Sequence, residues 1–222
     1  MYRKTYQLGN FIFEIESEKE FSAPENLAIF ETEAMEPDFT ILLEGDDKPE
    51  PVVLMEKYGL RAAMLKKKAI VLHSSFIDVA GAGIVFTAKS GVGKSTQADL
   101  WEKERDAFIV NGDRALLSVS ENGITVGGMI YNGTSQICHN WTVPLKAIVL
   151  LGRGENRVLP VRPVDAFKEI LCQCAFNVNE REQVEEATEI VAKLVTDIPV
   201  VRLLARPDKG AVEALEEVLK QI

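Results

Sequence analysis

The stretch "IVFTAKSGVGKSTQADLW", residues 84 to 101, carries a glycine-rich loop between an apolar run and a segment with helical spacing. The apolar residues before the loop predict a buried strand, and Ala98, Trp101 and Arg105 fall near one face of a helix. Strand, loop and helix in this order are the context of a phosphate-binding P-loop, the Walker A pattern. The chain is therefore expected to build an α/β core around this loop.

The loop residues suit the binding of ATP and Mg²⁺. Consecutive backbone N–H groups at the positive end of a helix bind phosphate oxygens, and glycines keep side chains out of their way. Lys94 is expected to reach the terminal phosphates and the Ser95 hydroxyl to bind Mg²⁺. The alternative is a glycine turn that happens to end in Lys-Ser. The predicted nucleotide-binding residues are Ser90, Gly91, Val92, Gly93, Lys94, Ser95 and Thr96.

Ala88 occupies the position where the usual P-loop pattern has its first glycine. That glycine eases the turn out of the strand, where another small residue can substitute. Gly91 and Gly93 border the phosphates more closely, and both are present. The pattern therefore still predicts nucleotide binding.

A carboxylate for the metal follows further along the chain. Asp113 comes after the apolar run Phe108 to Val110, where a strand is predicted. A carboxylate at the end of a neighbouring strand is suited to hold Mg²⁺, directly or through water. The alternative for Asp113 is a plain turn residue.

Composition excludes several classes of protein. The chain has 222 residues and a net charge of −9, and its one basic cluster, Lys66 to Lys68, is short, so a nucleic-acid backbone is not the expected partner. No membrane span and no signal peptide are predicted, and the expected location is the cytoplasm. The three cysteines are interpreted as reduced thiols. Cys172 and Cys174 fall in a predicted helix, two residues apart, and so are not expected to share a metal.

Two parts of the chain differ in the secondary structure that their sequence patterns predict. Residues 1–68 are predicted to be a β-rich N-terminal portion, with a hairpin turn at Gly9-Asn10 and a further strand at "PVVLMEK". Residues 69–222 alternate strands and helices and are predicted to be the nucleotide-binding domain. Four helices are predicted in this part. The first follows the glycine-rich loop, the next two are "PVDAFKEILCQCAF" and "NEREQVEEATEIVAKLV", and the last begins after Asp208.

The stretch "LHSSFIDVAGAGIVFTAKSGVGKST", followed by "VNGDR", resembles the C-terminal catalytic domain of HPr kinase/phosphorylase. The resemblance covers residues 69 to 119, and "VPLKAIVLLGRGENRV" is similar to shorter HPr-kinase-related bacterial proteins. It implies a phosphoenolpyruvate carboxykinase-like P-loop core with a mixed β-sheet. The related full-length kinases assemble into rings, so a homo-oligomer is one candidate state, although the sequence itself does not reveal the oligomeric state.

The resemblance also implies roles for single residues. Lys94 would clamp the ATP phosphates, Ser95 and Asp113 would bind Mg²⁺, and His73 would lie near the phosphates as a catalytic residue. The alternative for His73 is a hydrogen-bonded core histidine at a strand end. The candidate substrate or phosphate contacts are Arg114, which matches the arginine of the family motif, and two loop arginines, Arg153 and Arg157.

Gly112 departs from the family pattern. The family has paired aspartates there, one serving as base and the other as metal ligand, and this chain has Gly112-Asp113. Because phosphoryl transfer depends mainly on positioning and charge neutralisation, loss of one base need not abolish it, and Asp113 or His73 could take its place.

Three functions follow from these features. The first is an ATP-dependent kinase that transfers the γ-phosphoryl group to a serine-type hydroxyl of a protein, peptide or small molecule. The second is a nucleotide-binding regulatory or scaffold module without transfer activity, which Gly112 favours. The third is a carboxykinase-like enzyme acting on a metabolite.

Overall fold

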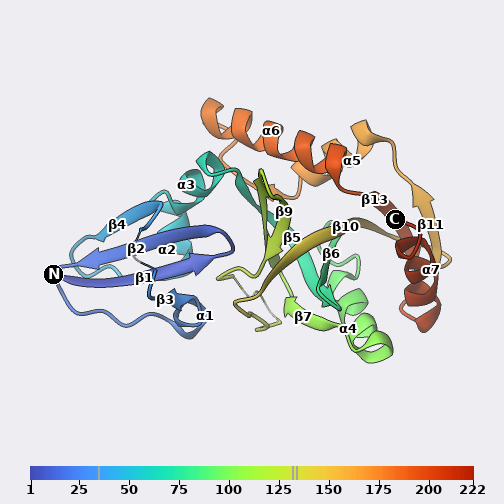
Figure 1. Cartoon of the computed structure of the whole chain (residues 1–222), viewed down its shortest axis with the longest axis horizontal. Helices are drawn as coiled ribbons and strands as arrows, with labels where there is room; N and C mark the ends of the chain where they lie inside the picture. The colour runs from blue at the N-terminus through green and yellow to red at the C-terminus, as the bar shows by residue number, and fades with distance from the viewer. Residues whose placement is uncertain (35, 132, 134) are drawn as a thin grey trace.

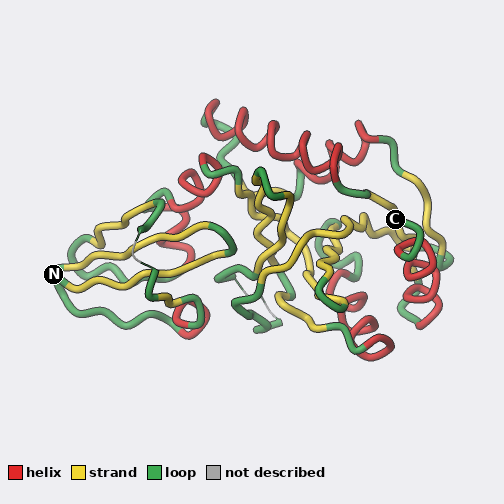
Figure 2. Tube along the Cα trace, in the orientation of Figure 1, coloured by secondary structure: helices red, strands yellow, loops and turns green. Residues whose placement is uncertain are grey.

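The computed structural model describes residues 1–34, 36–131, 133 and 135–222. Within these residues the chain is a mixed α/β protein whose strands form two sheets (Figure 1). The smaller sheet lies at the N-terminal end of the molecule, and the larger one carries the glycine-rich loop. The path of helices and strands along the chain can be followed in Figure 2.

The N-terminal sheet has the strand order β3-β1-β2-β4. Its hairpin joins β1 (Tyr2–Leu8) to β2 (Phe11–Ser17) through a turn in which Gly9 has a φ of +58°. The predicted hairpin is therefore confirmed, and glycine meets the positive φ without strain. The sheet is completed by β3 (Glu31–Thr32) and β4 (Phe39–Leu43).

This portion is less β-rich than the sequence predicted. It also contains helices α1 (Glu25–Ala28), α2 (Pro51–Glu56) and α3 (Leu60–Lys66). The predicted strand at "PVVLMEK" is wrong, because this segment is α2. Pro51 stands in the first turn of α2, where its missing N–H costs nothing, and Pro51, Leu54 and Met55 are buried at helical spacing.

The larger sheet has the strand order β11-β13-β10-β6-β5-β8-β9, with β7 and β12 paired to β5. The second half of β10 pairs in parallel with β6 and β13, and its first half pairs antiparallel with β9. The sheet thereby curls round until β9 meets β10. Its strands are β5 (Ala69–Val79), β6 (Ala82–Thr87), β7 (Phe108–Asn111), β8 (Arg114–Ser120), β9 (Gly123–Gly127), β10 (Thr142–Arg153), β11 (Arg157–Pro160), β12 (Cys174–Ala175) and β13 (Val200–Ala205).

Helices pack against this sheet from two sides (Figure 1). On one side, α4 (Lys94–Arg105) and α7 (Lys209–Leu219) share a core with β6 and β10; the Asp208 side chain caps α7 by accepting from Gly210 N–H at 2.9 Å. On the other side lie α5 (Pro163–Leu171) and α6 (Arg181–Asp197). The buried residues of α6 recur at helical spacing: Ala187, Ile190, Val191 and Leu194.

The helix predicted over "PVDAFKEILCQCAF" ends earlier than expected. It stops at Leu171, and Cys174 instead pairs with Leu72 of β5 as part of β12. The prediction that Cys172 and Cys174 lie in a helix is therefore wrong. The apolar run continued past the true end because both the helix and the strand after it are covered by the same core.

The N-terminal sheet shares its core with the rest of the chain. Leu116, Met129 and Ile130 pack in one cluster with Tyr6 and Phe13. The boundary predicted between residues 68 and 69 stays a prediction. Among the described residues, none of the helices is long and apolar enough to cross a membrane.

Candidate functional site

The glycine-rich loop (residues 88–93) joins the end of β6 to the start of α4. Gly91 has a φ of +77° and Gly93 a φ of +121°, values that side chains strain to adopt. Ala88 is not among the described residues with positive φ, so alanine fits there without backbone strain. The structure thus gives a physical reason why alanine is tolerated at 88 and glycine is needed at 91 and 93.

Lys94 is the first residue of α4, and its side chain is folded back over the loop. Its Nζ donates to the carbonyl oxygen of Ala88 at 3.2 Å, and the residue is only 8% exposed. Burial lowers the pKa of Lys94, Asp113 opposes that shift, and Arg114 adds to it. Ser90, Ser95 and Thr96, which precede or follow the lysine in the chain, are exposed.

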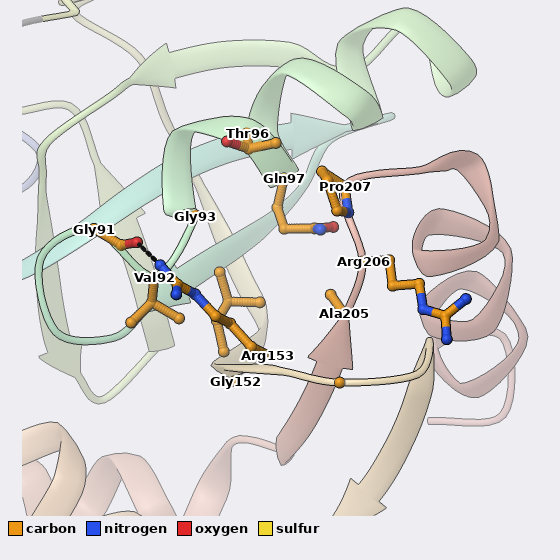
Figure 3. A pocket seen from close by; sticks show the side chains of 12 residues that line it. Gly91, Val92, Gly93, Thr96, Gln97, Gly152, Arg153, Ala205, Arg206 and Pro207 are labelled. Carbon is orange, nitrogen blue, oxygen red and sulfur yellow. Dashed lines mark hydrogen bonds between the residues drawn. The ribbon is translucent and has the colours of Figure 1, made fainter.

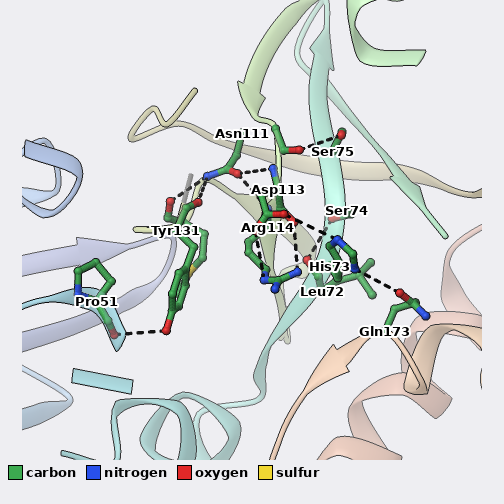
Figure 4. Close-up of polar contacts among 12 residues, drawn as sticks. Pro51, Leu72, His73, Ser74, Ser75, Asn111, Asp113, Arg114, Tyr131 and Gln173 are labelled. Atoms are coloured by element: carbon green, nitrogen blue, oxygen red, sulfur yellow. Dashed lines mark hydrogen bonds and ion pairs between the residues drawn. The ribbon is translucent and has the colours of Figure 1, made fainter. Parts of the chain in front are cut away.

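Asp113 lies in the turn between β7 and β8, next to His73 of β5 (Figure 4). Its Oδ1 is 3.7 Å from His73 Nε2, and its Oδ2 is 3.5 Å from Arg114 Nε. His73 and Arg114 are direct partners in the β5–β8 register. The other ring nitrogen of His73, Nδ1, lies 3.3 Å from Gln173 Oε1.

The charges of this cluster act on His73. Burial lowers its pKa first, and the cations Lys94 and Arg114 lower it further, while Asp113 and Gln173 work in the opposite direction. The structure therefore brings four of the predicted site residues into one electrostatic group: Lys94, His73, Asp113 and Arg114. The neutral imidazole is the favoured form of His73 at neutral pH.

The space beside Gly112 is filled by Ser135. A Cβ placed on Gly112 would collide with the Ser135 hydroxyl and would lie 2.6 Å from its Cβ. Gly133 approaches Asp113 in the same way, since a Cβ there would lie 2.7 Å from the Asp113 Cβ. Gly133 and Ser135 therefore pack against the Gly112-Asp113 turn, and Ser135 leaves no room for a side chain at 112.

A cavity of about 440 Å³ opens beside the glycine-rich loop, next to α4 (Figure 3). It lies at the carboxyl ends of the parallel strands β6, β10 and β13, the usual place for a ligand in an open α/β sheet. The lining residues are Gly91, Val92, Gly93, Thr96, Gln97, Leu151, Gly152, Arg153, Gly154, Ala205, Arg206 and Pro207.

The two loop arginines lie in different surroundings. Arg153 lines this cavity, and its Nη2 donates to the carbonyl oxygen of Gly91 at 3.0 Å. Arg157 begins β11 opposite Leu204 and is exposed, outside the residues that line the cavity. A second cavity of about 350 Å³ lies on the α5 side of the loop, bordered by Ala88, Lys89 and Gln173 among others.

Sequence reasoning missed several residues that the structure brings to the site. Gln173 contacts His73 from a segment interpreted as helix, and Arg206 reaches the first cavity from the turn after β13. Asn111 ties the Asp113 turn to its surroundings. The signal for Asn111 was present in "FIVNGDR", since asparagine before a glycine often closes a turn with its own side chain.

Comparisons with known proteins give little further guidance. No protein-family model and no curated protein matches the chain. Among solved structures, the HPr(Ser) kinase/phosphatase from Coxiella burnetii is similar at 15% identity and a TM-score of 0.36, over 68% of this chain and 93% of that one. This is a distant likeness, and the roles below are assigned from the residues of this chain.

Proposed function

We propose that this protein binds ATP with Mg²⁺ and transfers the γ-phosphoryl group to a serine-type hydroxyl of a protein, peptide or small molecule. The observation that carries the proposal is the placement of Lys94. It starts a helix behind a loop with two positive-φ glycines, and it shares its electrostatic surroundings with His73 and Asp113. In this proposal the core is a P-loop core of the phosphoenolpyruvate carboxykinase-like kind.

The nucleotide would lie along the glycine-rich loop. Backbone N–H groups of residues 91 to 96 would receive the phosphates at the positive end of α4, where anions are favoured. To do so, the phosphates would draw the Lys94 ammonium away from the Ala88 carbonyl. The cavity lined by Gln97, Arg153 and Arg206 would take the nucleoside.

The residues present fit a Mg²⁺ ion that travels with the nucleotide. Mg²⁺ is commonly held by one or two carboxylates, waters and substrate phosphates, and not by a protein cage. Accordingly, the described residues contain no group of three or more His, Cys, Asp or Glu side chains that could hold a metal alone. Asp113 and the Ser95 hydroxyl would hold the ion, which when bound neutralises charge on the phosphates.

In this proposal His73 receives the acceptor's proton and Asp113 assists it. With its own proton on Nδ1 toward Gln173 Oε1, His73 leaves Nε2 as an acceptor on the side facing Asp113. In the transfer, the bond from the γ-phosphorus to the ADP oxygen breaks and a bond to the acceptor oxygen forms. The hydroxyl proton passes to His73 Nε2, and the negative Asp113 stabilises the imidazolium that results.

Nucleotide binding and transfer are tested separately. Calorimetry with ATP and Mg²⁺ should give binding that Lys94→Ala weakens strongly, whereas Lys103→Ala, an exposed lysine on the same helix, should leave it unchanged. Transfer is measured with γ-labelled ATP against a library of serine-containing peptides and a cell extract. Label on an acceptor that requires Lys94 supports the kinase.

The negative outcomes separate the alternatives. Tight ATP binding without transfer to any acceptor would favour a nucleotide-binding regulatory module, the function that the blocked position at Gly112 suits. Absence of both binding and transfer would reject the phosphate-binding role of the loop itself.

A further inference from the structure

Asn111 is the last residue of β7 and is fully buried, two residues before Asp113. Its side-chain oxygen Oδ1 accepts from the backbone N–H groups of Asp113 and Arg114, both at 2.9 Å. Its side-chain nitrogen Nδ2 donates to the carbonyl oxygens of Met129 and Tyr131, both at 2.8 Å. Figure 4 shows Asn111 between the Asp113 turn and Tyr131.

These four bonds use the whole hydrogen-bonding capacity of an asparagine amide. The amide has two acceptor positions on oxygen and two donor hydrogens on nitrogen. An aspartate of the same shape would keep the acceptors but would turn a second oxygen toward two carbonyl oxygens. An alanine would remove the bonds to both N–H groups and to the Tyr131 carbonyl, whereas the Met129 carbonyl would still accept from the Cys138 thiol at 3.0 Å.

The backbone around Asp113 is held from the other side as well. Ser74 N–H donates to the Asp113 carbonyl at 3.1 Å, and the Ser75 hydroxyl donates to the Gly112 carbonyl at 3.1 Å. Among the residues that the structure describes, the Asp113 carboxylate has longer contacts to His73 and Arg114, and Gly133 packs against it. The backbone of this turn determines where the Asp113 side chain begins, and Asn111 fixes that backbone through two hydrogen bonds.

We propose that Asn111 is a positioning residue, which holds the turn so that the Asp113 carboxylate faces the metal. The proposal rests on the Mg²⁺ role proposed for Asp113. Residues that orient a ligand from behind commonly contribute about tenfold or more to metal affinity. Asn111 acts through Asp113 and touches neither nucleotide nor metal.

Asn26 offers a matched control. Its Nδ2 donates to the Ile130 carbonyl at 2.6 Å, so it holds the same segment, residues 129 to 131, from the N-terminal portion. Within the described part of the chain, the Asn26 side chain has no hydrogen bond to the Asp113 turn. Asn26→Ala therefore loosens the segment and lowers stability without acting on Asp113.

The experiment compares the affinity of the full chain for ATP with and without Mg²⁺. A titration with Mn²⁺ measures binding of the metal as a second quantity. The variants are Asn111→Ala, Asn111→Asp and Asn26→Ala, each first checked for folding by circular dichroism and thermal melting. In both Asn111 variants, ATP affinity without metal is expected to stay within about twofold, while the gain from Mg²⁺ falls about tenfold. Asn26→Ala is expected to keep the full gain.

Each outcome decides one point. A wild-type protein whose ATP affinity does not respond to Mg²⁺ rejects the metal role of Asp113, and with it the proposed function. If the wild type responds and a folded Asn111 variant responds equally, only the role of Asn111 is rejected. If neither Asn111 variant folds, or Asn26→Ala loses the gain to the same extent, Asn111 is a purely structural residue and the proposal fails.

Discussion

His73 Nε2 lies 3.7 Å from Asp113 Oδ1, close enough for the carboxylate to act on the charge of the ring but too far for a hydrogen bond. Lys94 and Arg114 oppose the carboxylate, and burial favours the uncharged ring. The net result is a histidine whose pKa lies below its ordinary value of 6.5. Its protonation state therefore reports on the charges around it.

The first prediction concerns the titration of His73. In an NMR titration the His73 ring should titrate below pH 6.5, and Asp113→Asn should lower its pKa further because the stabilising carboxylate is lost. Lys94→Ala should raise the pKa, because a repelling cation is removed. The chain has two histidines, so a His73→Gln spectrum assigns the signals.

The lowered pKa of His73 also predicts how the folding stability and the transfer rate change with pH. Because the pKa of His73 is lower in the folded than in the unfolded chain, its contribution to folding stability is present above pH 6.5 and is lost as the pH falls below it. If His73 is the base, the acid limb of the transfer rate should also lie below pH 6.5. A His73 resonance that titrates above its ordinary pKa would contradict both statements.

The second prediction concerns Gly112. Gly112→Ala should lower the free energy of unfolding by about 1–3 kcal/mol, because the added methyl group overlaps Ser135. Chemical denaturation of the wild type and the variant measures this difference. Gly112→Asp should be at least as destabilising, and it should not increase transfer activity.

A double-mutant cycle tests the cause of that loss. Ser135→Gly removes both side-chain atoms that the new Cβ would meet, so the double variant should recover part of the stability lost in Gly112→Ala. Strictly additive effects would show that the two positions do not interact, and the steric account of Gly112 would be wrong.

The strand, glycine-rich loop and helix start between residues 84 and 96 are predictable from the sequence because their signals are local. "IVFTAKSGVGKST" contains a buried strand, two glycines at positive φ and the start of a helix, all within one short stretch. The hairpin at Gly9 and the helix cap at Asp208 are local in the same way. Each depends on neighbours within a few residues, so the sequence alone predicts it.

The errors have two causes: a local helix signal that was given too little weight, and contacts between residues far apart in the sequence. Pro51, Leu54 and Met55 were interpreted as part of a strand, although their spacing fits a short helix that packs on the N-terminal sheet. Cys174 left the predicted helix because β5 supplies a strand partner at Leu72. Ser135 fills the space at Gly112 from a segment far along the chain, and no local pattern signals such a contact.

The third prediction distinguishes the three thiols. Burial raises the pKa of Cys138 to about 11, and burial also raises the pKa of Cys174, whereas Cys172 is exposed beside the second cavity. In the native protein at pH 8, a thiol reagent such as DTNB should therefore label Cys172 first. Cys172→Ser should remove the fast phase, and Cys174→Ser should leave it unchanged.

The fourth prediction concerns the metal carboxylate. Asp113→Asn keeps the shape of the side chain but removes its charge, so ATP should bind without Mg²⁺ at least as well as to the wild type. The gain in affinity from Mg²⁺ should fall about tenfold or more, since a neutral amide is a poor ligand for this ion. Isothermal calorimetry with ATP, in EDTA and in Mg²⁺, measures both quantities.

Asp106→Asn is the matched control for this substitution. Asp106 is exposed at the far end of α4 with a φ of +51°, a conformation that asparagine adopts readily, so the exchange removes the same charge away from the site. The gain in ATP affinity from Mg²⁺ should be retained in Asp106→Asn and should fall in Asp113→Asn. Equal gains in the two variants would remove Asp113 from the metal site and leave the Ser95 hydroxyl as the remaining protein ligand proposed for the ion.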